Sequence, residues 1–296
     1  MNRIPQLKTR ATTAVLFVAV MLGALLWNRW TYFLLFSIIH FGCWFEFFRL
    51  AERYDAQHGK FPRLQQFLIS VLGWSGLLLF CGPSFQIQAI SMSALGNWLG
   101  LAFILVLPVS VFLFSSPWGF RSFLYVVFGW SYLSLPCAIM MHFYEDVQLT
   151  IQGIAYQWPP WGIAIVVIFS IWLSDTFAYL VGSWLGRTPL SSISPKKTWE
   201  GVAGGWLLSS VIMGLVCQGV PQLQHLLQPV LWMNIAVSMT GTAGDLLESK
   251  MKRMAGVKDS GSFLPGHGGF LDRFDALLLA IPVAWLIFHG LLQRDI

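Results

Sequence analysis

Long apolar stretches recur along the whole chain, and they constrain its fold more than any other feature of the sequence. A helix that crosses a lipid bilayer needs about 20 mainly apolar residues. About nine stretches approach that length, near residues 11–28, 31–50, 66–83, 94–115, 121–142, 161–185, 200–219, 229–247 and 272–292. We therefore expect an all-α, polytopic integral membrane protein with about nine transmembrane helices.

The charge content supports a bilayer as the solvent. Only 10% of the 296 residues are charged, whereas soluble domains carry about 25%. The formal net charge of +5 would suit a nucleic-acid partner, but the basic residues lie between apolar stretches rather than on one soluble face. The composition therefore indicates a lipid environment and argues against nucleic-acid binding.

The distribution of Lys and Arg predicts how these helices are oriented, because cytoplasmic loops of membrane proteins are enriched in both residues. If the N-terminus is cytoplasmic, all but two of the 18 Lys and Arg residues fall on the cytoplasmic side. Only Arg29 and Arg294 fall on the other side. This asymmetry predicts an odd number of transmembrane helices, with the N-terminus in the cytoplasm and the C-terminus on the opposite side.

Acidic residues are concentrated in the second half of the chain. Seven of the 13 lie between residues 170 and 280, namely Asp175, Glu200, Asp245, Glu248, Asp259, Asp272 and Asp275. A carboxylate at the bilayer centre costs roughly 2.5–3.5 kcal/mol on insertion scales, so it is tolerated mainly where it pairs, lines a wet cavity or binds a metal ion. We therefore expect a polar site built from this part of the chain.

The first polar motif lies inside the predicted helix 161–185. Asp175, Tyr179 and Gly182 are spaced at i, i+4 and i+7, so they share one face of that helix. A functional carboxylate is one interpretation of this face. A helix-packing face with small residues is the other.

The second motif runs from Ser194 to Gly201. Pro195 is typical of the start of a helix, and Lys196 and Lys197 near a helix N-terminus would suit a phosphate group. The alternative is an ordinary basic loop on the cytoplasmic side of the membrane.

The third motif lies at the end of the predicted helix 229–247 and just beyond it. Asp245, Glu248 and Lys252 follow helical spacing and align on one face, where Glu248 and Lys252 form a favourable i, i+4 pair. A salt-bridged helix end would explain that pair. It does not explain why Asp245 follows such an apolar stretch.

The fourth motif, residues 258–275, is rich in glycine. Backbone N–H groups of a glycine loop can meet phosphates. Asp272 and Asp275, at i and i+3, can face one ion at the start of the last helix, and hard oxygen ligands beside such a loop indicate Mg²⁺. His267 taken alone is more often a structural residue.

These four motifs together resemble the phosphatidate cytidylyltransferases (CDP-diacylglycerol synthases). The strongest part of the resemblance is a set of fixed residues near the C-terminus: Ser249, Lys252–Arg253, Lys258–Asp259, Pro265–Gly269 and Asp272–Asp275. The motifs around Asp175, Lys196–Gly201 and Gly244–Asp245 are also similar to those of the family. The first half of the chain matches mainly in hydropathy and in Glu46.

The resemblance implies an activity and its partners. A member of this family would convert CTP and phosphatidate to CDP-diacylglycerol and diphosphate in phospholipid biosynthesis. It would use Mg²⁺, with a second, monovalent cation left open, and act as a homodimer in the lipid bilayer. With the charge asymmetry, this predicts a multi-pass protein of the bacterial inner membrane whose active site faces the cytoplasm. We expect one transmembrane domain over 1–296, with variable N-terminal helices in 1–160 and catalytic helices in 161–296.

The resemblance and the charge pattern also suggest roles for single residues. The predicted catalytic residues are Asp175, Asp245, Glu248, Lys252, Arg253, Asp272 and Asp275. The metal ligands are expected to be Asp245, Asp272 and Asp275, followed by Asp175 and Glu248. The residues predicted to bind substrate and its phosphates are Lys196, Lys197, Glu200, Ser249, Lys258, His267, Gly268, Gly269 and Arg273.

Two alternatives remain open. An ion-coupled transporter would also carry carboxylates inside the membrane, although transporters usually place them near the midplane with repeat symmetry. The nearer alternative is a related membrane enzyme that uses CTP on another lipid, such as a polyprenol kinase or an archaeal-lipid cytidylyltransferase.

Overall fold

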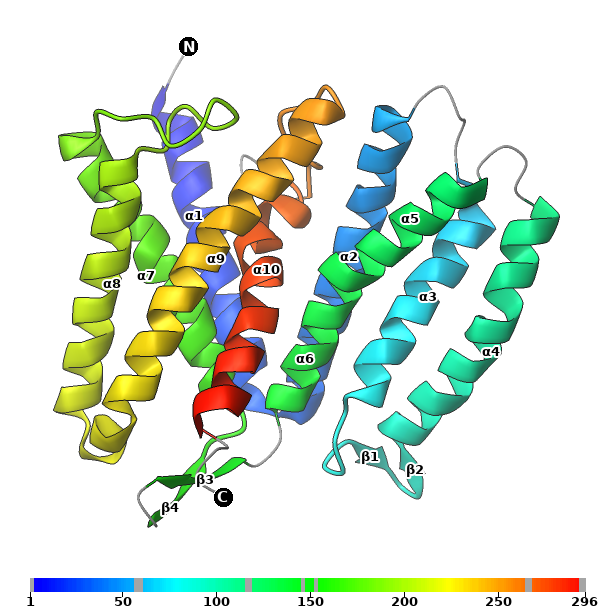
Figure 1. Cartoon of the computed structure of the whole chain (residues 1–296), viewed down its shortest axis with the longest axis horizontal. Coiled ribbons are helices and arrows are strands. Elements are labelled where there is room, and N and C mark those ends of the chain that lie inside the picture. Colours follow the sequence, from blue (N-terminus) through cyan, green and yellow to red (C-terminus); the bar gives the residue numbers. More distant parts are fainter. Residues whose placement is uncertain are drawn as a thin grey trace. The chain divides into compact units, whose positions relative to one another are not determined.

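Helices make up most of the computed structural model (Figure 1), which describes residues 3–55, 61–114, 119–144, 147–151, 154–263 and 268–292. The α-helices in these ranges are α1 (Arg3–Trp27), α2 (Arg29–Tyr54), α3 (Arg63–Leu79), α4 (Met92–Phe114), α5 (Gly119–Gly129), α6 (Leu135–Phe143), α7 (Gly162–Leu185), α8 (Trp199–Gly219), α9 (Leu227–Met254) and α10 (Leu271–Ile287). Two π-helical segments, Trp130–Ser134 and Phe288–Leu292, continue α5 into α6 and extend α10.

The predicted apolar stretches coincide with these helices. Each stretch overlaps one α-helix, except that 121–142 covers α5, the π-helical segment and α6 together. Among the described residues, four helical segments are long and apolar enough to cross a membrane: Arg29–Tyr54, Phe123–Phe143, Gly162–Leu185 and Trp199–Gly219. The chain is therefore a helical membrane protein, as its hydropathy predicted.

Two short β-hairpins, which were not predicted from the sequence, join consecutive helices. β1 (Gln86–Ile87) pairs antiparallel with β2 (Ile90–Ser91), and β3 (Val147–Ile151) pairs antiparallel with β4 (Ile154–Trp158). Gln88 closes the first hairpin with a φ of 54°, the left-handed conformation that tight hairpin turns require. The all-α expectation thus holds for the long segments but not for these connections.

The chain divides into two compact units, each built from two segments. The first unit comprises Met1–Glu145 and Met251–Phe274, and the second comprises Asp146–Lys250 and Asp275–Ile296. The boundaries fall inside α9 and α10, so each of these helices contributes residues to both units.

The core of the first unit is centred on α2. Asn28 caps this helix by accepting hydrogen bonds from the backbone N–H groups of Trp30 (2.8 Å) and Thr31 (3.0 Å). Trp44 is fully buried and donates from Nε1 to Ser134 Oγ at 2.9 Å. Aromatic packing and such satisfied polar contacts fix α2 within the unit.

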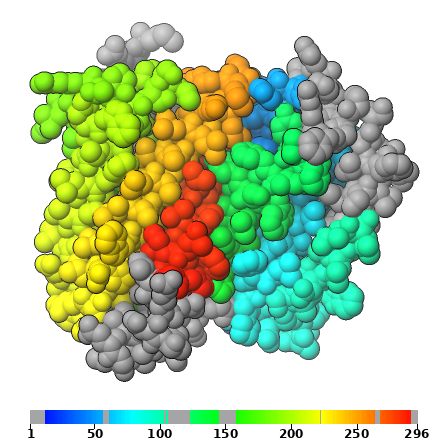
Figure 2. Space-filling view, viewed as in Figure 1, coloured from blue at the N-terminus to red at the C-terminus, as the bar shows by residue number. Residues whose placement is uncertain are grey.

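The second unit is organised around α7, α8 and the first part of α9. Glycines let α7 and α8 approach closely, because a Cβ atom at Gly201 would lie 2.7 Å from the carbonyl oxygen of Ala178 and 2.9 Å from Gly182 Cα. Asn234 of α9 donates to Ser210 of α8 at 2.9 Å, and the two helices lie side by side as yellow-green and yellow surfaces in Figure 2. Gly182 therefore serves helix packing, which was the alternative interpretation of its motif.

Candidate active site

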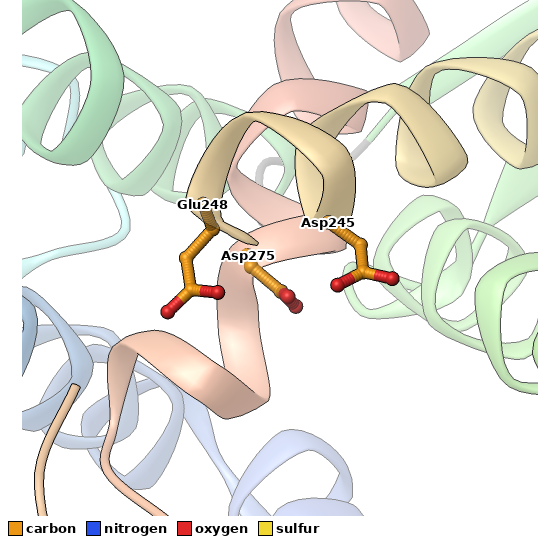
Figure 3. A group of neighbouring side chains, drawn as sticks. All are labelled: Asp245, Glu248 and Asp275. Atoms are coloured by element: carbon orange, nitrogen blue, oxygen red, sulfur yellow. The ribbon is translucent and has the colours of Figure 1, made fainter. Parts of the chain in front are cut away.

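Three carboxylates converge where α9 and α10 meet in the second unit (Figure 3). Asp245 and Glu248 project from α9 and Asp275 projects from α10, and one oxygen atom of each lies within 4.8 Å of the others. Glu248 is fully buried, whereas the other two are half-buried. A Cβ atom at Gly244 would lie 2.5 Å from the carbonyl oxygen of Asp275, so a glycine is needed for this close approach of the helices.

Lys197 supplies positive charge to this carboxylate group. It lies in the loop between α7 and α8, and its ammonium group forms an ion pair with Asp245. Burial alone would lower the pKa of Lys197, but Asp245 and Asp175, with a further contribution from Asp275, outweigh burial and raise the pKa above its usual value. Lys197 therefore remains charged at neutral pH and lies within electrostatic reach of three of the predicted carboxylates.

The loop that carries Lys197 is held by its own hydrogen bonds. Helix α8 begins at Trp199, with Thr198 as its N-cap, rather than next to Pro195 as the sequence suggested. A threonine side chain can accept a helix N–H, and Thr198 accepts that of Gly201 at 3.2 Å. Lys196 in the same loop is exposed.

Glu200, which was predicted to bind substrate, contacts the backbone of this loop. Its carboxylate accepts hydrogen bonds from the N–H groups of Arg187 and Thr188, each at 3.1 Å. Ser249 on α9 lies next to the carboxylate group, with its hydroxyl 3.4 Å from Asp245 Oδ1. The structure thus gives Glu200 an evident scaffolding role, whereas Ser249 borders the three carboxylates.

Asp272 is the centre of a polar cluster in the first unit. Its Oδ1 accepts from Lys252 Nζ at 2.6 Å, and its Oδ2 accepts from the backbone N–H groups of Ser260 (2.9 Å) and Gly269 (2.8 Å). Lys252 and Asp272 are both largely buried. The donors around Asp272 occupy both of its oxygens, and Asp272 is not a member of the three-carboxylate group.

Glu46 joins this cluster from α2, more than 200 positions away in sequence. It is 3% exposed and accepts from Ser260 Oγ at 2.6 Å and from the N–H groups of Phe270 and Leu271 at 3.0 and 2.9 Å. Its carboxylate therefore holds the 260–271 segment and caps the start of α10. No role was predicted for Glu46 from the sequence, although a carboxylate inside the predicted helix 31–50 is itself a signal of a functional or structural role.

Two glycines complete the turn before α10. Gly268 has a φ of 87°, in the left-handed region that favours glycine. The N–H of Gly269, which was predicted to meet substrate phosphates, donates to Asp272 in this structure. These glycines therefore shape the loop around two buried carboxylates.

Gly269→Ala is expected to destabilise the protein by about 1–3 kcal/mol, as overpacking of a filled space usually does. The reason is that an added Cβ atom would overlap the Glu46 carboxylate. The melting temperature in detergent measures this effect. Gly23→Ala is the matched control, because a Cβ atom there meets nothing within 4 Å, and equal melting of the two variants would contradict the proposed crowding.

The remaining predicted residues are more dispersed. Arg253 donates to the carbonyl oxygen of Val257 at 3.2 Å. Lys258 and Arg273 are exposed. His267 lies outside the described residues. Of the three foremost metal candidates, the structure brings Asp245 and Asp275 together, and Glu248 stands with them in the place predicted for Asp272.

Known proteins provide an independent comparison. A family model described as "Cytidylyltransferase family" matches residues 8–291. The chain is 32% identical over 282 residues to the phosphatidate cytidylyltransferase of Pseudomonas aeruginosa, covering 94% of this chain and 95% of that protein.

Two further relatives match over a shorter segment. The chain is 43% identical over 144 residues to phosphatidate cytidylyltransferase 5, chloroplastic, of Arabidopsis thaliana, covering 48% of this chain. It is 42% identical over 144 residues to the phosphatidate cytidylyltransferase of Staphylococcus epidermidis, again covering 48% of this chain. The chain thus spans only 36% and 51%, respectively, of these two proteins.

Proposed function

Because the chain belongs to the cytidylyltransferase family, we propose that it transfers the cytidylyl group of CTP to phosphatidate, yielding CDP-diacylglycerol and diphosphate. The observation that carries this proposal is the convergence of Asp245, Glu248 and Asp275 beside Lys197. Such a group suits a reaction between two phosphates, in which charge must be neutralised and the reacting atoms aligned. The family match favours this enzyme over the ion-coupled transporter.

The membrane arrangement forms part of the proposal. Nine transmembrane helices, with the N-terminus in the cytoplasm and the C-terminus opposite, would place the α7–α8 loop and the end of α9 on the cytoplasmic side. CTP is a cytoplasmic nucleotide, so Lys197 and the carboxylates would face its supply. The bacterial relatives support a location in the bacterial inner membrane, and the homodimer rests on the family resemblance alone.

The three carboxylates are a suitable donor set for a divalent cation. Each contributes hard oxygen atoms, the ligand type that Mg²⁺ prefers, and three negative groups crowded within 4.8 Å are stabilised by a cation. We propose that Asp245, Glu248 and Asp275 hold Mg²⁺, with Asp175 nearby and a second, monovalent cation left open. Bound Mg²⁺ would act as a Lewis acid that offsets charge on the phosphate oxygens.

The residues of the chain would position the two substrates. A phosphate oxygen of phosphatidate attacks the α-phosphorus of CTP, the bond from that phosphorus to the bridging oxygen of the β-phosphate breaks, and diphosphate leaves. Lys197, charged at neutral pH, and the exposed Lys196 would orient the triphosphate. Arg253, Lys258, Arg273 and His267 are also proposed to contact substrate phosphates. No side chain needs to form a covalent intermediate, so none is assigned as a nucleophile.

Lys252 and Asp272 would contribute by holding the loop between α9 and α10 in place. Their hydrogen bond of 2.6 Å is largely buried, and it connects the end of α9 to the start of α10. In this proposal Asp272 positions the loop, and it becomes a metal ligand only if its present donors are exchanged.

The purified protein, incubated with labelled CTP and phosphatidate, is expected to form CDP-diacylglycerol identified by mass. Parallel reactions with a polyprenol and with an archaeal lipid acceptor test the related CTP-dependent enzymes. Product from one of these acceptors, without product from phosphatidate, would replace the proposed substrate. The absence of cytidylyl transfer to any of the three lipids would contradict the proposed activity.

A further inference from the structure

An open groove of about 660 Å³ lies along α2 in the first unit. One wall consists of Leu34, Ile38, Phe41 and Phe45, which recur at helical spacing and share one face of α2. These four side chains are between 37% and 60% exposed, so packing among the described residues does not fill the groove. Its volume lies in the range of sites that hold small organic ligands.

The length of this wall matches one leaflet of a membrane. From Leu34 to Phe45, α2 rises about 16 Å at 1.5 Å per residue. The hydrocarbon core of a bilayer is about 30 Å thick, so each leaflet contributes about 15 Å. A single acyl chain lying on this wall would be in contact with protein over nearly the full depth of its leaflet.

A positive charge stands at one end of the wall. Arg49 lines the groove one helical turn beyond Phe45, and its guanidinium lies 5.7 Å from the centre of the Phe45 ring. Arg49 takes no part in the Lys197–Asp245 and Lys252–Asp272 ion pairs of the described residues. A guanidinium at the end of an apolar wall is complementary to a lipid phosphate, which it can bind through two parallel hydrogen bonds.

Glu46 also lines the groove, but its carboxylate oxygens are engaged by hydrogen-bond donors of the segment before α10. Its two oxygens accept hydrogen bonds from Ser260 Oγ and from the N–H groups of Phe270 and Leu271. These donors fix the Glu46 carboxylate against the segment before α10 rather than against the Arg49 guanidinium, which leaves the guanidinium available to an anion. The polar end of the groove therefore favours a negatively charged headgroup.

The opposite wall belongs to the loop that precedes α10. Ser262, Phe263 and Phe270 line the groove, and the rings of Phe263 and Phe270 lie 4.0 Å apart. Phe270 sits against the backbone of α2, because a Cβ atom at Gly42 would lie 2.6 Å from its ring. A lipid in the groove would consequently touch the segment that leads directly into α10, which carries Asp272 and Asp275 in its first turns.

We propose that this groove binds phosphatidate, with one acyl chain along the Leu34–Phe45 face and the phosphate at Arg49. The identity of the lipid rests on the proposed function, whereas the preference for an anionic lipid rests on the groove itself. The groove would select phosphatidate from the cytoplasmic leaflet and hold its phosphate at the level of the lipid headgroups.

Photo-crosslinking tests the site without requiring turnover. The full-length protein, reconstituted in nanodiscs, is exposed to phosphatidate that carries a diazirine in its acyl chain. Crosslinks are expected on α2 between Leu34 and Phe45, and unlabelled phosphatidate should compete better than phosphatidylcholine. Arg49→Gln and Ile38→Trp, which remove the charge and fill the groove, are each expected to lower this labelling at least about fivefold.

Kinetics provide the second measurement. In mixed micelles, Arg49→Gln and Ile38→Trp are expected to raise the KM for phosphatidate about tenfold, and the KM for CTP should stay unchanged. Arg53→Gln is the control for charge, since Arg53 is exposed one turn further along α2. Leu207→Trp is the control for added bulk, since Leu207 is a 66% exposed side chain on α8.

The outcomes separate this inference from the proposed function. If the protein makes CDP-diacylglycerol but both groove variants keep wild-type labelling and KM values, the groove assignment is wrong and the activity stands. If phosphatidate labels α2 competitively but no cytidylyl transfer occurs, the groove stands and the activity is wrong. An Ile38→Cys variant that forms disulfide-linked dimers in membranes would assign the groove to a second copy of the chain and overturn the lipid site.

Discussion

Asp245→Asn is expected to reduce the formation of CDP-diacylglycerol about 1000-fold while the protein still inserts into the membrane. The substitution removes a charge from the group formed with Glu248 and Asp275 and also removes the ion-pair partner of Lys197. Losing a cation that neutralises two reacting phosphates raises the activation free energy by several kcal/mol, and an increase of about 4 kcal/mol lowers the rate about 1000-fold. Asp275→Asn is expected to have an effect of similar size.

A direct measurement of cation binding makes this prediction sharper. Mn²⁺, followed by electron paramagnetic resonance, is expected to bind the wild-type protein and to bind both variants at least about tenfold more weakly. Asp55→Asn, the same chemical change at the end of α2, is the control and should leave activity and Mn²⁺ binding unchanged. Normal turnover in Asp245→Asn and Asp275→Asn would refute the assignment of these carboxylates to the metal.

Glu46→Ala is expected to lower stability by about 3–5 kcal/mol and activity by about two orders of magnitude. It would leave the Ser260 hydroxyl and the N–H groups of Phe270 and Leu271 without their acceptor. An unsatisfied buried donor costs about 1–3 kcal/mol. The activity would fall because a loop misplaced by about 1 Å can reduce a rate about 100-fold.

A graded series distinguishes a positioning residue from a merely buried one. Glu46→Gln keeps the shape and one acceptor oxygen, so it should retain a larger part of the melting temperature and kcat than Glu46→Ala. Glu52→Gln, on the same helix but bonded to Gln66, should behave like the wild type. If Glu46→Ala kept the melting temperature and kcat of the wild type, the hydrogen bonds from the loop to Glu46 would contribute neither to stability nor to activity.

The helices could be predicted from the sequence because each is a long apolar segment, a pattern that does not depend on partners. Asp245 and Glu248 could likewise be assigned to one face, since their spacing of three residues fixes this within α9. The hairpin β3–β4 was not predicted because its strands are only five residues long, and an apolar stretch of about 20 residues indicates a helix but not a short strand. Pro195 indicated the start of α8, but the helix begins at Trp199 because the Thr198 side chain caps it.

The contacts between helices could not be derived in the same way. Asp272 and Asp275 were expected to share one ion, because they are three residues apart on one helix. In the structure Asp275 joins the α9 carboxylates, while Asp272 is surrounded by Lys252, Ser260 and Gly269. Which of two neighbouring carboxylates meets another helix depends on packing, and no local pattern in one sequence encodes it.

The hydrogen bonds of Glu46 also bear on the order in which the protein is assembled. Ribosomes add about 5–20 residues per second, so roughly 10–45 s separate the synthesis of α2 from that of Phe270 and Leu271. During this interval the Glu46 carboxylate is already in the nascent chain without the donors that later surround it. A chain that stops short of Ser260 would lack all three of these donors, so Glu46 can complete its hydrogen bonds only after nearly the whole chain has been made.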